Sequence, residues 1–278
     1  MCIPKTGKVK EITSLSNSII KDLKALSQKK NRNRENLFMA EGLKLVIDAL
    51  NLGWTIQTLI FSKSKIGHGT IENIAARTVA NGGFVIKASQ KVMESITRRD
   101  NPQTVIGIFK QQWQPTEMIK GQTKDVYVAL DQVRDPGNLG TIIRTADAVG
   151  AKGVILIGET TDPFSPETVR ATMGSIFSVP LYRFDENAFL KWSASFKGMI
   201  VGTHLKGSTD YRTIDFKNGP IILLMGSEKQ GLPDILANRC NKLARIPQSG
   251  RADSLNLAIA TAIMLYEIRR PHLILEPV

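Results

Sequence analysis

The chain has 278 residues, enough for two domains, and 42% of them are apolar, so a packed core needs no disulfide or metal. Two cysteines and three scattered histidines disfavour a disulfide scaffold or a zinc site, and no apolar run has the length of a membrane span or signal peptide. The formal net charge is +12, and residues 1–112, with 18 Lys and Arg against 8 Asp and Glu, hold +10 of it. We therefore expect a soluble, cytoplasmic, metal-free protein whose first part binds nucleic acid.

Residues 1–112 predict a small α/β domain. Residues 1–10 are expected to form a loose basic tail, and residues 29–34 a basic loop or helix end. Helices are expected near 16–28, 41–50, 71–81 and 90–96, and strands near 37–40, 55–61, 84–87 and 104–109. The cations of the basic run are candidate nucleic-acid contacts: Lys29, Lys30, Arg32 and Arg34. A polar, proline-bearing linker over 113–123 is expected to end this domain.

Residues 124–278 predict a second domain in which strands and helices alternate. Strands are expected at 126–131, 153–157, 179–184, 199–204, 221–225 and 242–246. Helices are expected near 138–149, 166–175, 186–195, 231–238 and 254–269. This alternation favours a mostly parallel sheet with helices on both faces.

The first of three polar segments follows the strand at 126–131. A Pro-Gly turn leads into a helix expected to begin at Asn138, whose amide can cap the first turn, and Arg144 lies two turns further on. An amide and a guanidinium near one exposed turn can bind a polyanion. Gly137 and Gly140 lack the spacing of a dinucleotide-binding fingerprint, which argues against a Rossmann-type oxidoreductase or methyltransferase.

Two later segments have the same strand-loop-helix form. In one, Glu228 lies between a strand that ends at Gly226 and the next helix, and the glycine leaves backbone groups open to a flat ligand. In the other, Ser254 is a natural helix cap as well as a candidate ligand. Asn256 would place an amide in the first turn of an apolar helix, where it needs a partner.

Together the three segments resemble the SpoU (TrmH-like) family of RNA ribose 2′-O-methyltransferases in the SPOUT superfamily. The matching motifs are Asn138-x-Gly140-x-x-x-Arg144, Gly226-x-Glu228-x-x-Gly231-Leu-Pro233, and Ile246-Pro247 followed by Ser254-Leu-Asn256. Residues 14–110 are similar to the N-terminal substrate-binding domain of that family, which has a ribosomal-protein-like α/β fold. The resemblance thus covers nearly the whole chain.

The resemblance implies a C-terminal SPOUT domain with a deep trefoil knot, and a homodimer with its sites beside the subunit interface. It implies S-adenosylmethionine as methyl donor, held by the backbone around Thr203, Gly226, Ile246, Leu255 and Asn256. The catalytic set that it implies is Asn138, Arg144, Glu228, Ser254 and Asn256.

The same resemblance implies an RNA substrate, with ribosomal RNA favoured over transfer RNA. Arg170 and Arg251 are further candidate RNA contacts, although either can equally be a solvated surface charge. A catalytically inactive RNA-binding relative remains the alternative to an enzyme.

Overall fold

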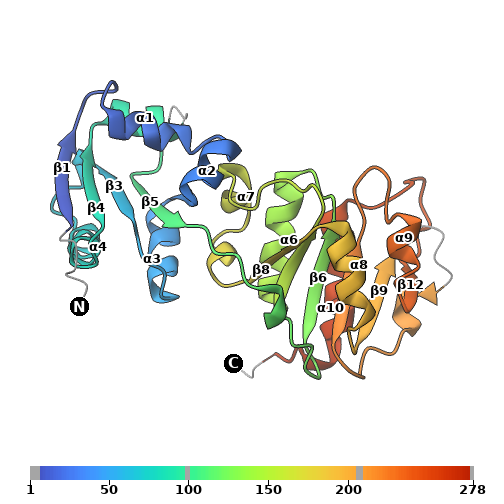
Figure 1. Cartoon of the computed structure of the whole chain (residues 1–278). Coiled ribbons are helices and arrows are strands. Elements are labelled where there is room, and N and C mark those ends of the chain that lie inside the picture. Colours follow the sequence, from blue (N-terminus) through green and yellow to red (C-terminus); the bar gives the residue numbers. More distant parts are fainter. Residues whose placement is uncertain (1–6, 98–100, 205–208, 276–278) are drawn as a thin grey trace. The chain divides into compact units, whose positions relative to one another are not determined.

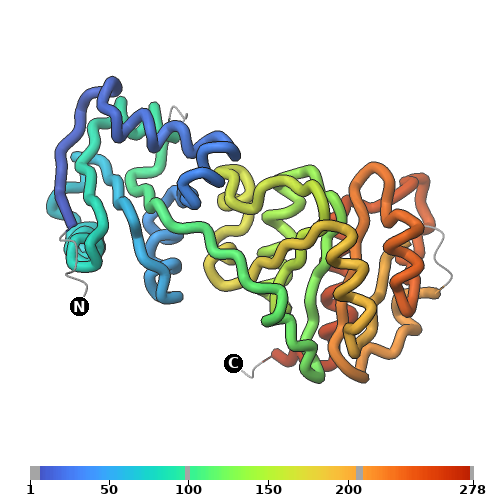
Figure 2. Tube along the Cα trace, viewed as in Figure 1, coloured from blue at the N-terminus to red at the C-terminus, as the bar shows by residue number. Residues whose placement is uncertain are grey.

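The protein forms two compact units in a computed structural model that describes residues 7–97, 101–204 and 209–275. Unit 1 contains Met1–Gln111 together with Phe164–Phe177, and unit 2 contains Gln112–Pro163 and Ser178–Val278. Figure 1 shows the elements of each unit, and Figure 2 follows the chain through them.

Unit 1 has a mixed five-stranded sheet in the order β1-β4-β3-β5-β2. Its strands are β1 (Lys8–Ile12), β2 (Leu37–Glu41), β3 (Thr58–Ser62), β4 (Phe84–Ala88) and β5 (Val105–Lys110). Its helices of the first 111 residues are α1 (Ser18–Ala25), α2 (Lys29–Glu35), α3 (Leu43–Asn51), α4 (Gly69–Ala80) and α5 (Gln90–Thr97). The expected basic tail is wrong over 8–10, because these residues belong to β1, which pairs with β4 and buries Ile12. Residues 1–6 lie outside the described part.

The basic run forms a helix of its own, α2, which ends at Asn36 in the left-handed conformation (φ 54°). Lys29, Lys30 and Arg34 are exposed on it. Arg32 is only 3% exposed, and its guanidinium donates a 2.8 Å hydrogen bond to the carbonyl oxygen of Leu26. The expectation that Arg32 contacts RNA is therefore wrong, since its charge is used inside the unit.

Phe164–Phe177, with helix α7 (Pro166–Ala171), follows a strand of unit 2 in sequence but belongs to the core of unit 1. The rings of Phe38 and Phe164 lie 5.0 Å apart, as do those of Phe109 and Phe177. The indole Nε1 of Trp54 donates a 2.8 Å hydrogen bond to the carbonyl oxygen of Phe177. The expected division into domains 1–112 and 124–278 places Phe164–Phe177 in the second domain, whereas these residues pack in unit 1.

Unit 2 has a seven-stranded sheet in the order β10-β12-β9-β11-β6-β7-β8, in which every pair is parallel, as the alternation of strands and helices predicts. Its strands are β6 (Val126–Asp131), β7 (Gly153–Ile157), β8 (Leu181–Phe184), β9 (Met199–Thr203), β10 (Thr209–Asp210), β11 (Ile221–Met225) and β12 (Lys242–Arg245). Its α-helices are α6 (Pro136–Ala148), α8 (Glu186–Ala194), α9 (Asp234–Ala237) and α10 (Leu257–Arg269).

Helices cover both faces of this sheet (Figure 1). Phe189 of α8 and Leu236 of α9 pack on one face with Tyr127 and Leu224, while α10 packs against α6 and β11 on the other. The strands β12, β9, β11 and β6 are consecutive neighbours, so the loops after their carboxyl ends meet at one edge. Ligands of open parallel sheets bind at such an edge.

Candidate active site

The loop after β11 is a tight turn that fixes the position of Glu228. The backbone N–H of Ser227 donates to the carbonyl oxygen of Gly231 at 3.1 Å, and the reverse bond measures 3.0 Å. A Cβ at Gly226 would lie 2.0 Å from the carbonyl carbon of Gly231, so the close approach of the turn itself requires this glycine. Gly231 has a φ of +68°, which glycine adopts without strain.

The helix α6 begins two residues earlier than expected. Asp135, and not Asn138, is its cap: the carboxylate Oδ1 accepts the backbone N–H of Asn138 at 2.6 Å, and Pro136 follows at the first helical position. The prediction that Asn138 caps α6 is therefore wrong. Its side chain is free to act elsewhere.

The start of α10 reverses the expected roles of Ser254 and Asn256. Asn256 is the cap, because its Oδ1 accepts the backbone N–H groups of Ala258 at 2.9 Å and Ile259 at 3.3 Å. Ser254 lies two residues before the cap and is exposed, so the prediction that Ser254 caps this helix is wrong.

Three amide and carboxylate side chains from the three segments form one hydrogen-bonded network. The Nδ2 of Asn256 donates to the Oδ1 of Asn138 at 2.9 Å, and the Nδ2 of Asn138 donates to the Oε1 of Glu228 at 3.1 Å. Residues 118 and 90 positions apart in sequence are thus joined directly. The sequence pattern placed these residues in one site, and the structure brings them together.

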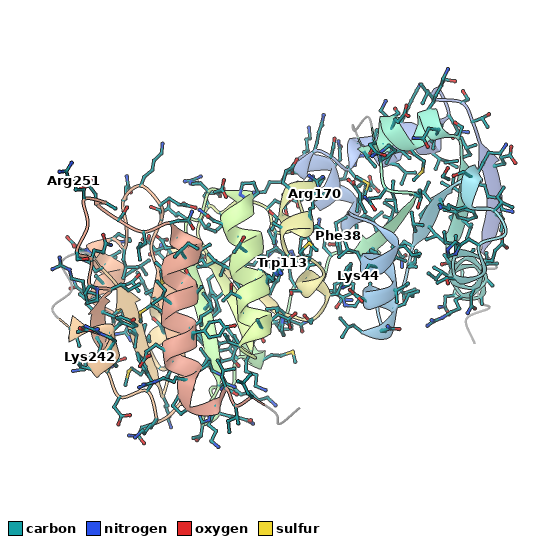
Figure 3. The ribbon with its side chains drawn as sticks, turned by 180° about the vertical axis from the view of Figure 1, so that it is seen from behind. Phe38, Lys44, Trp113, Arg170, Lys242 and Arg251 are labelled. Carbon is teal, nitrogen blue, oxygen red and sulfur yellow. The ribbon has the colours of Figure 1, made fainter. Side chains whose placement is uncertain are left out.

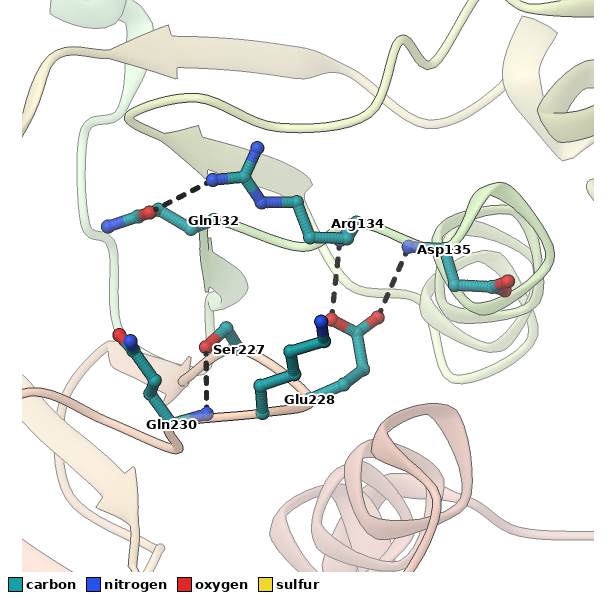
Figure 4. Close-up of a pocket in the computed structure, with 7 residues that line it drawn as sticks. Gln132, Arg134, Asp135, Ser227, Glu228 and Gln230 are labelled. Atoms are coloured by element: carbon teal, nitrogen blue, oxygen red, sulfur yellow. Dashed lines mark hydrogen bonds between the residues drawn. The ribbon is translucent and has the colours of Figure 1, made fainter.

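Glu228 also holds the loop between β6 and α6. Its carboxylate accepts the backbone N–H groups of Arg134 at 3.3 Å and Asp135 at 3.4 Å (Figure 4). Burial opposes ionisation of Glu228, but hydrogen bonds from the Asn138 side chain and from backbone N–H groups outweigh it and lower the pKa of this carboxyl. Glu228 therefore acts as an ionised acceptor that ties two loops together.

A cavity of about 560 Å³ adjoins the network, within the usual range for small-molecule sites. Its walls come from the ends of β9, β11 and β12 and from the start of α10. They include all five residues expected to bind the cofactor: Thr203, Gly226, Ile246, Leu255 and Asn256. Ser254 and Glu228 also line it. His204, which sequence reasoning missed, lies on the same wall; its place next to Thr203 at the end of a strand is the signal that could have revealed it.

Arg144 is not part of this arrangement. It is exposed on α6, six residues from Asn138, which places it about 120° away around a helix of 3.6 residues per turn. It does not line the cavity of about 560 Å³. Arg170 on α7 of unit 1 and Arg251 in the loop before α10 of unit 2 are also exposed, and Figure 3 labels both.

Comparison with known proteins shows the family to which the chain belongs. Residues 125–266 match the SpoU rRNA Methylase family, and residues 17–107 match an MRM3-like substrate binding domain. The chain is 60% identical to an S-adenosylmethionine-bound rRNA methyltransferase from Sinorhizobium meliloti, with a TM-score of 0.91 over 95% of this chain and 99% of that one.

Two characterised relatives are more distant. The 23S rRNA (guanosine(2553)-2′-O)-methyltransferase RlmP of Bacillus subtilis is 30% identical, over 94% of this chain and all of that protein. The SpoU methyltransferase AviRb of Streptomyces viridochromogenes, in complex with the same cofactor, is 29% identical, with a TM-score of 0.82 over 92% of this chain and 98% of that one. The chain belongs to the SpoU methyltransferase family, as its three motifs predict.

S-adenosylmethionine is the cofactor of this family, and the residues present fit it. The large cavity combines the apolar side chains of Ile246 and Leu255 with backbone groups at the ends of strands, which suits a flat adenine and a polar amino acid. Within residues 7–97, 101–204 and 209–275, no helix is long and apolar enough to cross a membrane. The same residues contain no group of His, Cys, Asp and Glu side chains that could hold a metal ion.

Proposed function

We propose that this protein methylates a ribose 2′-hydroxyl of RNA, with ribosomal RNA as the substrate class. The observation that carries the proposal is the network of Asn138, Glu228 and Asn256 beside a cavity of about 560 Å³. Two relatives that span nearly the whole chain support ribosomal RNA by their named activities: RlmP and a 23S rRNA (uridine(2479)-2′-O)-methyltransferase of Streptomyces viridochromogenes.

The bound cofactor supplies a methyl group that is already activated on a sulfonium. The task of the protein is then to orient a weakly nucleophilic hydroxyl in line with that methyl group. Glu228 and Asn256 fix the amide of Asn138, which can hold the ribose at the mouth of the cavity. Positioning of this kind can contribute up to ~7–11 kcal/mol.

Arg144 assists through its charge in this proposal. A guanidinium with an ordinary pKa above ~12 is a poor proton acceptor, so we assign it to stabilising negative charge that develops on the hydroxyl or on a nearby phosphate. Ser254, at the cavity wall, is assigned to the same reacting end of the site.

The test is transfer of tritium from methyl-labelled S-adenosylmethionine to purified ribosomal RNA, with transfer RNA in a parallel reaction. Digestion to nucleosides should return the label as 2′-O-methylnucleoside from ribosomal RNA. Label on a base, or on transfer RNA alone, would contradict the proposed reaction or its substrate.

Unit 1 is proposed to deliver the RNA. Its α2 presents the exposed cations Lys29, Lys30 and Arg34 on the unit with most of the positive charge, and α7 of the same unit adds Arg170. Arg251 of unit 2 remains a proposed contact beside the large cavity.

Changing Lys29, Lys30 and Arg34 together to alanine should weaken RNA binding by removing phosphate contacts. On single-stranded RNA each phosphate contact contributes about 0.7 to the slope of log affinity against log salt concentration, so losing three contacts should lower the magnitude of this slope by up to ~2. Filter binding at several salt concentrations measures it, with Arg77→Ala on α4 as an exposed control. An unchanged slope would mean that the three cations are only solvated.

We propose that the active form is a homodimer joined through α10. This helix is apolar nearly all round, yet Ile259 and Tyr266, at helical spacing, are 52% and 53% exposed. A helix apolar on every side is normally buried on every side, so a second copy is the occupant that completes its burial. We also propose that the trefoil knot lies in this region. The strand β12 is the neighbour of β9, and the chain that follows it crosses back so that α10 packs against α6 and β11.

Ile259→Glu should convert the dimer to a monomer while the fold is kept, because the side chain is exposed in the single chain. Light scattering coupled to size-exclusion chromatography reads the mass. The matched control is Ile235→Glu on α9, where the isoleucine is 50% exposed. A monomeric parent protein, or equal dissociation of both variants, would refute α10 as the interface.

A further inference from the structure

A second cavity, of about 510 Å³, adjoins the proposed cofactor cavity. Its walls are the loop between β6 and α6 and the turn after β11 (Figure 4), and its lining residues are Gln132, Arg134, Asp135, Ser227, Glu228, Lys229 and Gln230. The last four also line the larger cavity, so the turn that carries Glu228 is common to both. The proposed methyl transfer uses Glu228 of this cavity but gives no role to Gln132, Arg134 or Lys229.

The two carboxylates of this cavity are already engaged. Asp135 caps α6 through Oδ1, and Figure 4 shows its carboxylate turned toward that helix and away from the glutamines. Glu228 accepts two backbone N–H groups and the amide of Asn138. Their negative charge is therefore offset by N–H donors of the loop.

The two cations are not engaged in this way. Within the described part of the chain, the guanidinium of Arg134 donates one hydrogen bond, at 3.3 Å, to the neutral amide of Gln132, and its other N–H donors have no partner there. Lys229 is exposed at the tip of the turn, and across the described ranges no ion pair involves either cation. Burial, with a smaller contribution from Glu186, raises the pKa of buried Asp131 to about 6, and the positive charge of Arg134 opposes this rise.

Arg134 and Lys229 belong to loops whose backbone is fixed by hydrogen bonds. Gln132, which precedes Arg134 by two residues, has a φ of +49°, a left-handed conformation that is uncommon outside glycine and concentrates at ligand sites. The backbone N–H of Arg134 is bonded to Glu228, and Gln230 donates its backbone N–H to the Ser227 hydroxyl at 3.3 Å. The guanidinium, the ammonium and two amides thus surround one cavity on fixed loops.

We propose that this second cavity binds a backbone phosphate of the substrate RNA strand, next to the reacting ribose, through Arg134 and Lys229. The inference rests on the proposed function, because the ribose lies beside Asn138 and Glu228 on the wall shared by both cavities. A strand that places its sugar there carries a phosphate on each side of that sugar. The second cavity offers that phosphate two cations and the amide donors of Gln132 and Gln230.

The double variant Arg134→Gln with Lys229→Gln tests the proposal. It removes both charges but keeps side-chain length, and the bond to Glu228 survives because it comes from the Arg134 backbone. Binding of polyuridylic acid should show a salt slope lower by up to ~1.4, or about 0.7 for each single variant. The KM for ribosomal RNA should rise with little change in kcat, because a phosphate contact is the same before and during reaction.

Two further readouts separate the possible outcomes. Calorimetric affinity for S-adenosylmethionine should stay the same in the single variant Arg134→Gln, because Arg134 lines only the second cavity. Lys242→Gln, an exposed lysine of β12 that lines neither cavity, should leave the slope unchanged. Loss of cofactor affinity with an unchanged slope would assign the cations to the cofactor carboxylate and overturn the proposal, as would no change in either. Because polyuridylic acid binding needs no turnover, a failed methyl-transfer reaction would be distinguishable from a failure of this site.

Discussion

Arg144→Ala should lower kcat by about 10²–10³-fold while the affinity for S-adenosylmethionine stays unchanged. The size follows from losing one group that stabilises charge developing in the transition state. The cofactor affinity should survive because Arg144 is exposed on α6 and does not line the large cavity. Single-turnover assays with saturating RNA, together with calorimetry of cofactor binding, measure the two quantities.

Two companion variants sharpen this result. Arg144→Lys keeps the charge but loses the planar fork, so it should recover part of the rate. Asp147→Ala, an exposed change on the same helix, should leave the rate within about twofold. Normal turnover in Arg144→Ala would show that the guanidinium has no part in the reaction.

The position of Arg144 adds a test of the proposed homodimer. It lies about 120° around α6 from Asn138, away from the network of its own chain. If the arginine of one subunit serves the site of its partner, mixing Arg144→Ala with Asn256→Asp protein should restore activity in the mixed dimers. Mixtures that stay inactive would place both residues in the site of a single chain.

Asn256→Asp should lower kcat by about 100-fold with little loss of stability. The aspartate keeps an oxygen that accepts from Ala258 and Ile259, so α10 stays capped. It loses the N–H donor that reaches Asn138 and sets a negative oxygen against the Asn138 carbonyl. The amide of Asn138 should then turn away from the orientation that the reaction needs.

The control for Asn256→Asp removes a helix cap elsewhere in unit 2. Asp185→Ala at the start of α8 loses the 2.7 Å bond from Ala188 and should cost about 1 kcal/mol of stability with normal kcat. Thermal unfolding and initial rates of both variants separate capping from catalysis. A fully active Asn256→Asp enzyme would mean that the network only supports the fold.

The sequence predicted most of the fold of unit 2 because buried parallel strands are short apolar runs that alternate with helical patterns. The strands at 126–131, 153–157 and 221–225 begin and end as expected. The strand β1 was missed because it is an edge strand with alternating lysines and only Ile12 buried. The place of Phe164–Phe177 in unit 1 depends on contacts between distant aromatic rings, which no local pattern reveals.

Within the site, motif spacing predicted that Asn138, Glu228 and Asn256 meet. It did not predict what each one does, nor that Arg144 of the same chain lies apart from them. Asp135 and Asn256 cap their helices, although Asn138 and Ser254 have equally good capping side chains. The choice depends on where the chain leaves the strand, and that is fixed by packing between α6, α10 and the sheet. The prediction that Arg32 contacts RNA failed for a related reason. The sequence of a basic run does not show which of its side chains is buried, and here Arg32 donates to the carbonyl oxygen of Leu26.

The most direct test of the account is hydrogen–deuterium exchange with and without S-adenosylmethionine. The central claim is that loops far apart in sequence form one cofactor cavity, with walls at Thr203, at Gly226–Leu232, at 244–248 and at 254–257. Saturating cofactor should slow amide exchange in all four stretches together and leave α1 to α5 of unit 1 unchanged. Protection confined to a single stretch, or found only outside these four, would contradict the claim.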